Sequence, residues 1–384
     1  MLNAKRILSV SGCSLTLLAV GLAASAASAS AEDTSPVLGH VYVNDNTTGA
    51  NSIAAFERHE DGSLTAAPAS PFPAGGAGSG TGLASQGALQ ATKDGRYLLA
   101  VDAGSNQISV LRVGRNGVPQ PVGAPVSSGG IDPNSIAISG KLVYVSNAGA
   151  GGTNVTGFFL APQGNLVPVP DSTVALPEGS APGDVLFNAT GKKLVVTLVG
   201  SSQIASFDVR AERLYAAPGS PYPGQGLGQI GAEFEPTNPE QLFVSNAHNG
   251  AGLGTVSAFE VNSLGELTSI GASPVADLQT APCWVTISEN GQYLFAVNTA
   301  SGTISSYQIS PDGELTLLGS VSAGPAGTGA VDARLSPDGK TLFVNASQSD
   351  AVAAFAVNGG ELTELTSSPT PLPVGAVASG IVVE

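Results

Sequence analysis

The sequence predicts an all-β protein, folded as a seven-bladed β-propeller of four-stranded antiparallel blades. Three observations lead to this prediction: an apolar strand motif that occurs seven times, alternating strands and turns that accompany the copies, and one unmatched strand at the C-terminus. A period of about 40 to 50 residues made of several short strands is typical of propeller blades.

The repeated motif is a short apolar run that ends in small or polar residues. Its seven copies are "VYVNDN" (Val41), "LLAVDAG" (Leu98), "LVYVSNAG" (Leu142), "LVVTLVG" (Leu194), "LFVSNAH" (Leu242), "LFAVNTA" (Leu294) and "LFVNASQ" (Leu342). Turn-forming Asp, Asn and Gly precede several copies, as in "SPDGKT", and an alternating strand such as "TISSYQI" follows. This WD40/YVTN-like repeat therefore predicts four antiparallel strands in each blade.

Proline residues indicate the outermost strand of several blades, and the C-terminal residues indicate the missing innermost strand of the first blade. Several repeats close with a proline-marked strand, as in "ASPFP" (Ala69), "GSPYP" (Gly219) and "SSPTP" (Ser367). Because proline cannot donate to a strand ladder, these strands belong on the outer edge of each blade. The first repeat lacks an innermost strand, whereas "GIVVE" (residues 380–384) is left over. We expect this C-terminal strand to complete the first blade and close the ring.

The first 31 residues are expected to be a secretory signal peptide. Lys5 and Arg6 precede the apolar run "LTLLAVGLAA" and the small-residue site "ASA", which is the order found in such peptides. The order "VSGC", ending at Cys13, leaves lipidation as an alternative. We expect a secreted (extracellular or periplasmic) protein without a membrane span, with residues 32–384 forming a single domain.

Charge and cysteine content restrict the partners. The chain has 29 acidic and 14 basic residues, and such a surface repels nucleic acid and anionic lipid. Only Cys283 remains after the expected cleavage, so the mature chain has no intramolecular disulfide. The sequence predicts a monomer, with no nucleic-acid partner, no cofactor and no metal.

The segments "SPDG", "YLFAVN" and "GELTLL" resemble those of the lactonase-type seven-bladed propellers, which include 6-phosphogluconolactonase-like and carboxymuconate-lactonizing proteins. The resemblance spans nearly the whole mature chain, and it implies that residues at the starts of the innermost strands surround the mouth of a central channel. Matched by position, these residues are Asn134, Gly183, Cys283 and Val331, followed by Ser135, Asp184, Trp284 and Asp332. The histidine, arginine and glutamate of the family are absent from the matched positions.

These positions supply the candidate site. Asp332 and Asp184 are the catalytic candidates, since a carboxylate can act as a base or hold a cation, although such residues more often satisfy a turn. The expected ligand-binding residues are Asn134, Ser135, Trp284, Cys283 and His248. Cys283 has no matched histidine beside it to activate a nucleophilic thiol. The glycine-rich "GGAGSGTG" (residues 75–82) is expected to be a flexible connection between blades.

Two functions follow from this set. The first is a non-catalytic module that binds a small neutral or sugar-like ligand, or an extracellular protein, through a degenerate lactonase site. The alternative is a hydrolase of a neutral lactone. A phosphorylated substrate is not expected, because the matched positions offer no clear cation to bind it.

Overall fold

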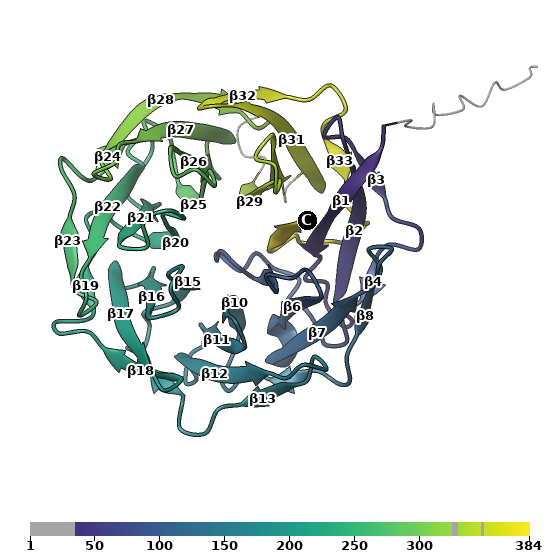
Figure 1. The fold of residues 1–384 in the computed structure, drawn as a ribbon, viewed down its shortest axis with the longest axis horizontal. Helices are drawn as coiled ribbons and strands as arrows, with labels where there is room; N and C mark the ends of the chain where they lie inside the picture. The colour runs from purple at the N-terminus through teal and green to yellow at the C-terminus, as the bar shows by residue number, and fades with distance from the viewer. Residues whose placement is uncertain (1–34, 325–328, 347–348) are drawn as a thin grey trace, which may run out of the picture. The chain divides into compact units, whose positions relative to one another are not determined.

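The computed structural model describes residues 35–324, 329–346 and 349–384, which form seven antiparallel sheets arranged in a ring (Figure 1). Residues 35–384 make one compact unit. Each blade has four strands, and six of the seven blades add a short fifth strand. The one helix in the described part of the chain is a single 3-10 turn, η1 (Ala103–Ser105). The prediction of a seven-bladed propeller is confirmed.

The strands follow the order inner to outer within each blade. Blade 1 contains β34 (Ile381–Val383), β1 (Val37–Asn44), β2 (Ser52–His59), β3 (Leu64–Ala66) and β4 (Phe72–Pro73). Blade 2 contains β5 (Leu89–Ala91), β6 (Tyr97–Asp102), β7 (Gln107–Val113), β8 (Pro119–Pro121) and β9 (Val126–Ser127). Blade 3 contains β10 (Pro133–Ser139), β11 (Leu142–Asn147), β12 (Asn154–Leu160), β13 (Leu166–Pro168) and β14 (Val174–Ala175). Blade 4 contains β15 (Pro182–Phe187), β16 (Lys193–Leu198), β17 (Gln203–Arg210), β18 (Arg213–Ala216) and β19 (Tyr222–Pro223).

The remaining three blades repeat this pattern. Blade 5 contains β20 (Gln229–Phe234), β21 (Gln241–Asn246), β22 (Thr255–Val261), β23 (Leu267–Ser269) and β24 (Val275–Ala276). Blade 6 contains β25 (Pro282–Ile287), β26 (Tyr293–Asn298), β27 (Thr303–Ile309) and β28 (Leu315–Ser322). Blade 7 contains β29 (Ala330–Leu335), β30 (Thr341–Ala346), β31 (Ala351–Asn358), β32 (Glu361–Glu364) and β33 (Thr370–Pro371).

The seven apolar motifs become the second strand of each blade, where blades pack against both faces. All residues of β6, β16, β21 and β30 are buried. A strand covered on both faces reads as a continuous apolar run, which explains why these segments were the clearest repeat in the sequence. The core is therefore divided among the interfaces between neighbouring blades.

The C-terminal strand closes the ring, as the sequence predicted. β34 pairs antiparallel with β1, joining Val41 to Val383 and Val43 to Ile381. Beyond the strand, the His40 amide donates to the Glu384 carbonyl at 3.0 Å, and the Glu384 amide donates to the His40 carbonyl at 2.8 Å. The first and last described segments thus share one sheet.

The proline-marked segments lie at the outer edge of their blades, where the outermost strand breaks into two pieces. At each break the serine before the proline accepts a hydrogen bond from an amide of the third strand. The four acceptors are Ser70 (2.9 Å), Ser220 (2.9 Å), Ser273 (2.6 Å) and Ser368 (3.0 Å). A buried amide left unpaired by the break is therefore satisfied by a side chain.

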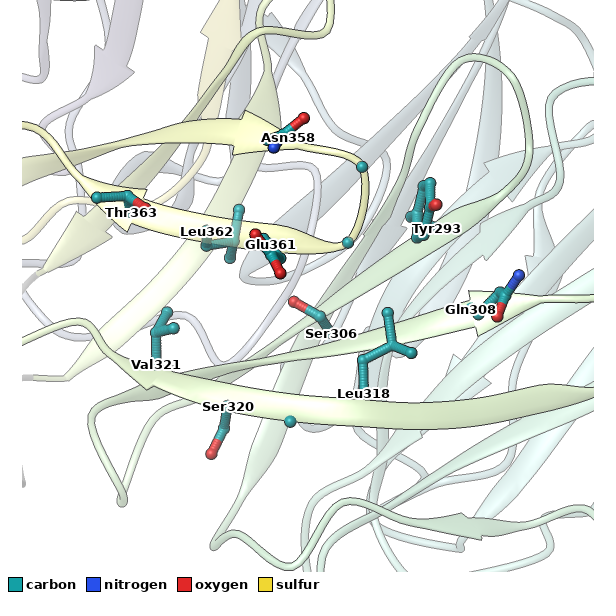
Figure 2. Close-up of a pocket in the computed structure, with 13 residues that line it drawn as sticks. Tyr293, Ser306, Gln308, Leu318, Ser320, Val321, Asn358, Glu361, Leu362 and Thr363 are labelled. Atoms are coloured by element: carbon teal, nitrogen blue, oxygen red, sulfur yellow. The ribbon is translucent and has the colours of Figure 1, made fainter.

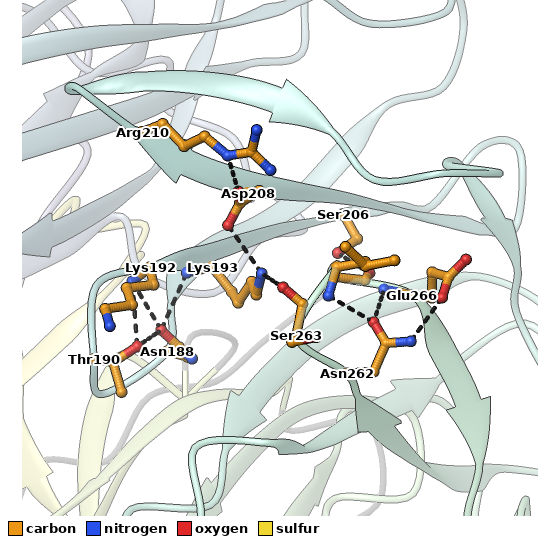
Figure 3. A network of polar contacts seen from close by, with 12 residues as sticks. Asn188, Thr190, Lys192, Lys193, Ser206, Asp208, Arg210, Asn262, Ser263 and Glu266 are labelled. Atoms are coloured by element: carbon orange, nitrogen blue, oxygen red, sulfur yellow. Dashed lines mark hydrogen bonds and ion pairs between the residues drawn. The ribbon is translucent and has the colours of Figure 1, made fainter.

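Neighbouring blades are also joined by the first residue of the second strand. Lys193 is buried, and its ammonium group donates to Asp208 at 2.9 Å and to the carbonyl of Ser263 in the next blade (Figure 3). The same position in blade 2 holds Tyr97, which donates to the carbonyl of Pro162 at 2.8 Å. In blade 5 it holds Gln241, which donates to the carbonyl of Pro311 at 3.1 Å. Chemically different residues therefore make one recurring contact between blades.

Removing residues 380–384 should open the ring. Ile381 and Val382 are buried, and burying one such side chain stabilises the fold by about 1.5–3 kcal/mol. We expect the truncated chain to unfold at a clearly lower temperature, and Ile381→Ala to lose about 2–5 kcal/mol. Thermal unfolding followed by circular dichroism checks both variants. A truncated chain that melts at the wild-type temperature would contradict closure by β34.

Candidate functional site

The mouth of the ring is the face at which the inner strands begin and the second strands end. Near these starts, β10, β15, β25 and β29 each carry a β-bulge. The residues skipped in the pairing are Asn134, Gly183, Cys283 and Asp332. Because a bulge bends the strand and re-aims its side chains, the bulges turn this row of residues toward the centre of the ring.

The centre is filled by residues 85–87, here called the plug, which come just before the short inner strand β5. Figure 1 shows the segment ahead of β5 reaching inward. Ser85, Gln86 and Gly87 are buried. The Gln86 amide donates to the Gly183 carbonyl at 2.9 Å, and the Ile136 amide donates to the Gly87 carbonyl at 3.0 Å. The plug is thereby fixed to blades 3 and 4.

The Gln86 side chain extends the plug to blades 5 and 6. Its Nε2 donates to the Ala232 carbonyl at 3.1 Å, and its Oε1 accepts from the Val285 amide at 3.1 Å. A Cβ at Gly231 would lie 2.4 Å from Gln86 Oε1, so only glycine leaves room for this side chain. The Trp284 indole donates to the Ser85 carbonyl at 2.7 Å. Both polar ends of the carboxamide are therefore satisfied at the centre of the ring.

Gly87 is close to both carboxyl groups proposed from the sequence. Its amide donates a long hydrogen bond, 3.5 Å, to Asp332 Oδ2. A Cβ on Gly87 would lie 3.5 Å from Asp184 Oδ1 on the other side. Asp184 Oδ1 accepts from the Ser135 hydroxyl at 3.0 Å, and Oδ2 accepts from the Ala232 amide at 3.1 Å. Both carboxyl groups therefore lie beside the plug, but only Asp332 also lines the mouth pocket.

Two further charged residues belong to this cluster, Glu233 and Arg334. Glu233 lies on β20, and Arg334 lies on β29 two residues after Asp332. Burial raises the pKa of Asp184 to about 8 and of Glu233 to about 7. Burial also raises the pKa of Asp332, while Arg334 opposes that shift. Burial alone would lower the pKa of Arg334, but Asp332, Glu233 and Asp184 raise it overall.

A pocket of about 330 Å³ lies at the mouth, above the plug. Its lining includes four residues that the sequence singled out, and they come from three blades: His248, Cys283, Trp284 and Asp332. Asp332 is only 1% exposed, and its Oδ1 has no hydrogen-bond partner among the described residues. The hydroxyl of Thr299, another lining residue, also makes no hydrogen bond within the described part of the chain. Because buried polar atoms are usually paired, these two atoms mark the polar part of the pocket wall.

The other predicted residues lie elsewhere. Asn134 Nδ2 donates to the Pro182 carbonyl at 2.6 Å, and its Oδ1 accepts from Ser146 at 2.8 Å. The Ser135 hydroxyl is occupied by Asp184 and by the Val185 amide. Neither residue lines the mouth pocket, and neither does Asp184. These three side chains hold the inner strands and the charge cluster in place.

The sequence analysis missed the plug and Glu233. The glycine-rich residues 75–82 were expected to be flexible, but Asn46 holds them: its Oδ1 accepts from the Ser79 amide at 2.8 Å, and its Nδ2 donates to the Thr81 carbonyl at 2.7 Å. One signal was present, because the apolar stretch for the inner strand of blade 2 is short. β5 has 3 residues, whereas β10 has 7.

The pocket residues do not favour a cysteine nucleophile or a metal site. Burial raises the pKa of the Cys283 thiol to about 11, so it stays protonated near neutral pH and is a poor nucleophile. Within the described residues, no three His, Cys, Asp or Glu side chains are grouped so that they could hold a metal ion. Acid–base chemistry by His248 or Asp332, and simple binding, remain.

A larger hollow of about 850 Å³ lies away from these residues, between blades 6 and 7 (Figure 2). Its lining includes Leu318 and Val321 of β28 and Glu361 of the hairpin opposite. None of the predicted site residues lines it. The mouth pocket is therefore the better candidate site, although it is smaller.

The comparisons with known proteins agree with the fold. A family model described as "Lactonase, 7-bladed beta-propeller" matches residues 235–371. This match and the shared fold support the lactonase-type propeller family, as the sequence predicted. A search of curated proteins gives no match. In the described part of the chain, no helix is long and apolar enough to cross a membrane.

Several solved structures share the fold at low sequence identity. A candidate 6-phosphogluconolactonase from Bacteroides uniformis superposes with a TM-score of 0.70, at 19% identity over 90% of this chain and 98% of that chain. The periplasmic gluconolactonase of Pseudomonas aeruginosa gives 0.72, at 18% identity over 90% and 98%. The hydrazine synthase of Kuenenia stuttgartiensis gives 0.56, at 18% identity over 80% and 93%. Such different names on one fold mean that the function has to be argued from the site.

Substituting Gly87 should test the plug. Its φ of +85° is the left-handed region, and a Cβ would lie 2.9 Å from Ser135 Oγ. Alanine at a positive φ already destabilises the fold. We expect Gly87→Ala to lose about 1–3 kcal/mol beyond that cost, because its Cβ also clashes with the packed plug. Gly123→Ala is the matched control, since Gly123 has a φ of +69° and a Cβ added there would meet nothing within 4 Å. Equal losses in urea unfolding of the two variants would argue against a packed plug.

The buried carboxyl groups should make stability fall as pH rises. An unfolded aspartate ionises near pH 4, but the pKa of Asp184 in the fold is about 8. The folded chain therefore keeps a proton that the unfolded chain releases, and the unfolding free energy drops between about pH 4 and pH 8. Asp184→Asn should flatten this slope by up to about 1.4 kcal/mol per pH unit. Urea unfolding across this range measures the slope, with exposed Asp312→Asn as control; identical slopes for Asp184→Asn and wild type would refute the assignment.

Proposed function

We propose that this chain is an exported, non-catalytic lactonase-family propeller that binds a small neutral ligand in the mouth pocket. The observation that carries the proposal is the position of the plug. Gly87 contacts Asp332 and packs close to Asp184. Of the two aspartates, Asp332 lines the mouth pocket and Asp184 does not, so a substrate bound there does not reach both carboxyl groups. A degenerate lactonase site is consistent with this arrangement.

The pocket lining supports a ring-shaped ligand with hydroxyl groups. Asp332 Oδ1 and Thr299 Oγ1 are unpaired polar atoms at the pocket within the described residues. Carboxylate and hydroxyl oxygens accept hydrogen bonds from ligand hydroxyls. The Trp284 ring and the apolar edge of Leu83 supply contact area for the less polar part of a ligand. A sugar or a neutral lactone fits this chemistry, whereas a phosphate would meet the Asp332 carboxyl.

Export and the signal peptide are part of the proposal. The basic, apolar and small-residue order of residues 1–31 supports them, and those residues lie outside the described part of the chain. An extracellular protein that covers the mouth loops is the other partner compatible with a binding role.

One alternative function has a specific observation in its favour. His248 and Asp332 line the same pocket, and a histidine or carboxylate can act as the general base of a hydrolase. Hydrolysis of a neutral lactone is therefore the second candidate.

Tryptophan fluorescence can distinguish the two functions, because Trp284 is the single tryptophan of the chain. A panel of sugars and neutral lactones is titrated one compound at a time. We expect at least one of them to shift the Trp284 emission. Asp332→Asn should weaken their binding about tenfold, the loss of one charge-assisted hydrogen bond. Asp312→Asn, on an exposed turn far from the mouth, serves as control.

The same panel is then assayed for ring opening by pH-stat titration. We expect no turnover by the wild type. Lactone hydrolysis that Asp332→Asn and His248→Gln both abolish would overturn the binding-only proposal and establish the hydrolase. A panel without any fluorescence change or turnover would reject the mouth pocket as a small-molecule site.

A further inference from the structure

Charge is distributed unevenly around the ring. Residues 89–223, which form blades 2 to 4, contain nine basic and eight acidic residues. Residues 229–371, which form blades 5 to 7, contain two basic and fourteen acidic residues. In Figure 1 these two groups of blades occupy opposite parts of the ring.

The asymmetry is concentrated on the face opposite the mouth, here called the hairpin face. This face carries the turns between the first and second strands, and between the third and fourth strands, of each blade. Exposed basic residues at these turns in blades 2 to 4 are Lys93, Arg96, Arg115, Lys141, Lys192 and Arg213. Exposed acidic residues at the turns of blades 5 to 7 are Glu240, Glu289, Asp312, Glu314, Asp338 and Glu361. We call these two sets the basic half and the acidic half.

Part of this charge is neutralised locally. Arg96 pairs with Asp94 at 2.6 Å, Arg213 lies 3.5 Å from Asp171, and Lys340 lies 4.0 Å from Asp338 in the acidic half. Among the described residues, Lys93, Lys141 and Lys192 form no ion pair. One face of the molecule therefore presents a basic half and an acidic half side by side.

We infer that the hairpin face docks a second copy of this chain, with the basic half of each copy against the acidic half of the other. A partner for this face has to complement both halves at once. A two-fold axis lying in the face, along the boundary between the halves, exchanges them, so the surface is complementary to itself. A closed dimer results, in which every contact occurs twice.

A polyanion is a poorer fit to the same surface. It would be attracted to the basic half only, and the acidic half and the net charge of −15 would repel it. A second copy is repelled by the same net charge, but that repulsion is screened beyond a Debye length of about 8–10 Å at physiological ionic strength. The charges in contact across the interface are screened less. The expectation of a monomer from the sequence is therefore replaced by that of a salt-sensitive dimer.

Sedimentation equilibrium of the full chain tests this inference. We expect dimers at about 0.1 M salt, where the net charge is already screened beyond about 10 Å, and monomers at about 0.5 M salt, since exposed charge pairs weaken as ionic strength rises. A basic-half variant (Lys93→Glu with Lys141→Glu) and an acidic-half variant (Glu289→Lys with Glu361→Lys) should each dimerise at least about tenfold more weakly at low salt. Mixing the two variants should restore association, because each now complements the other.

Glu178→Lys provides the control. It changes the net charge as Glu289→Lys does, but Glu178 lies in an exposed loop at the mouth, next to the Gly151 amide. We expect it to leave dimerisation unchanged. A wild type that is monomeric at low salt, a dimer that survives in both double variants, or an equal effect of Glu178→Lys would overturn the inference. The outcome does not depend on whether the mouth pocket binds a ligand.

Discussion

The hydrogen bonds of the plug determine what the centre of this propeller can do. Three consecutive residues, 85–87, bond to the inner strands of blades 3 to 7. In a ring whose blades otherwise contact only their neighbours, a central segment shared by five blades adds cross-links that no single blade interface provides. Ser85 of the plug also lines the mouth pocket, in which Asp332 supplies the one carboxyl group among the described residues.

The buried charges depend on this arrangement. Asp184, Glu233 and Asp332 each feel the charge of the Arg334 guanidinium, and burial disfavours the charged form of each carboxyl. Protonation of some of them, rather than complete ionisation, keeps the cluster close to neutral. An open channel would hydrate these groups and remove the effect. The plug therefore links the stability of the ring to the protonation of these three carboxyl groups. Among the three, Asp332 is the one that lines the mouth pocket.

The fold could be predicted from the sequence because each blade repeats the same local pattern. Residues 294–298 and 342–346 are buried on both faces, and burial of this kind leaves a continuous apolar run that stands out. The site was only partly predictable. Cys283, Trp284 and Asp332, taken from the positional match to the lactonase-type propellers, line one pocket with His248, which was chosen because it follows a repeat strand. The role of Gln86 was hidden, since a glutamine beside a glycine-rich connection has no local pattern, and the partners of its side chain lie more than 140 residues away.

Hydrogen–deuterium exchange of the plug amides tests the central claim most directly. The Gln86 amide donates to Gly183 and the Gly87 amide donates to Asp332, and exchange of both requires the ring to open. The account predicts that peptides covering residues 85–87 exchange as slowly as the buried strand β6. Exchange as fast as that of the exposed loop around Gly179 would contradict it, because the plug would then not occupy the centre of the ring.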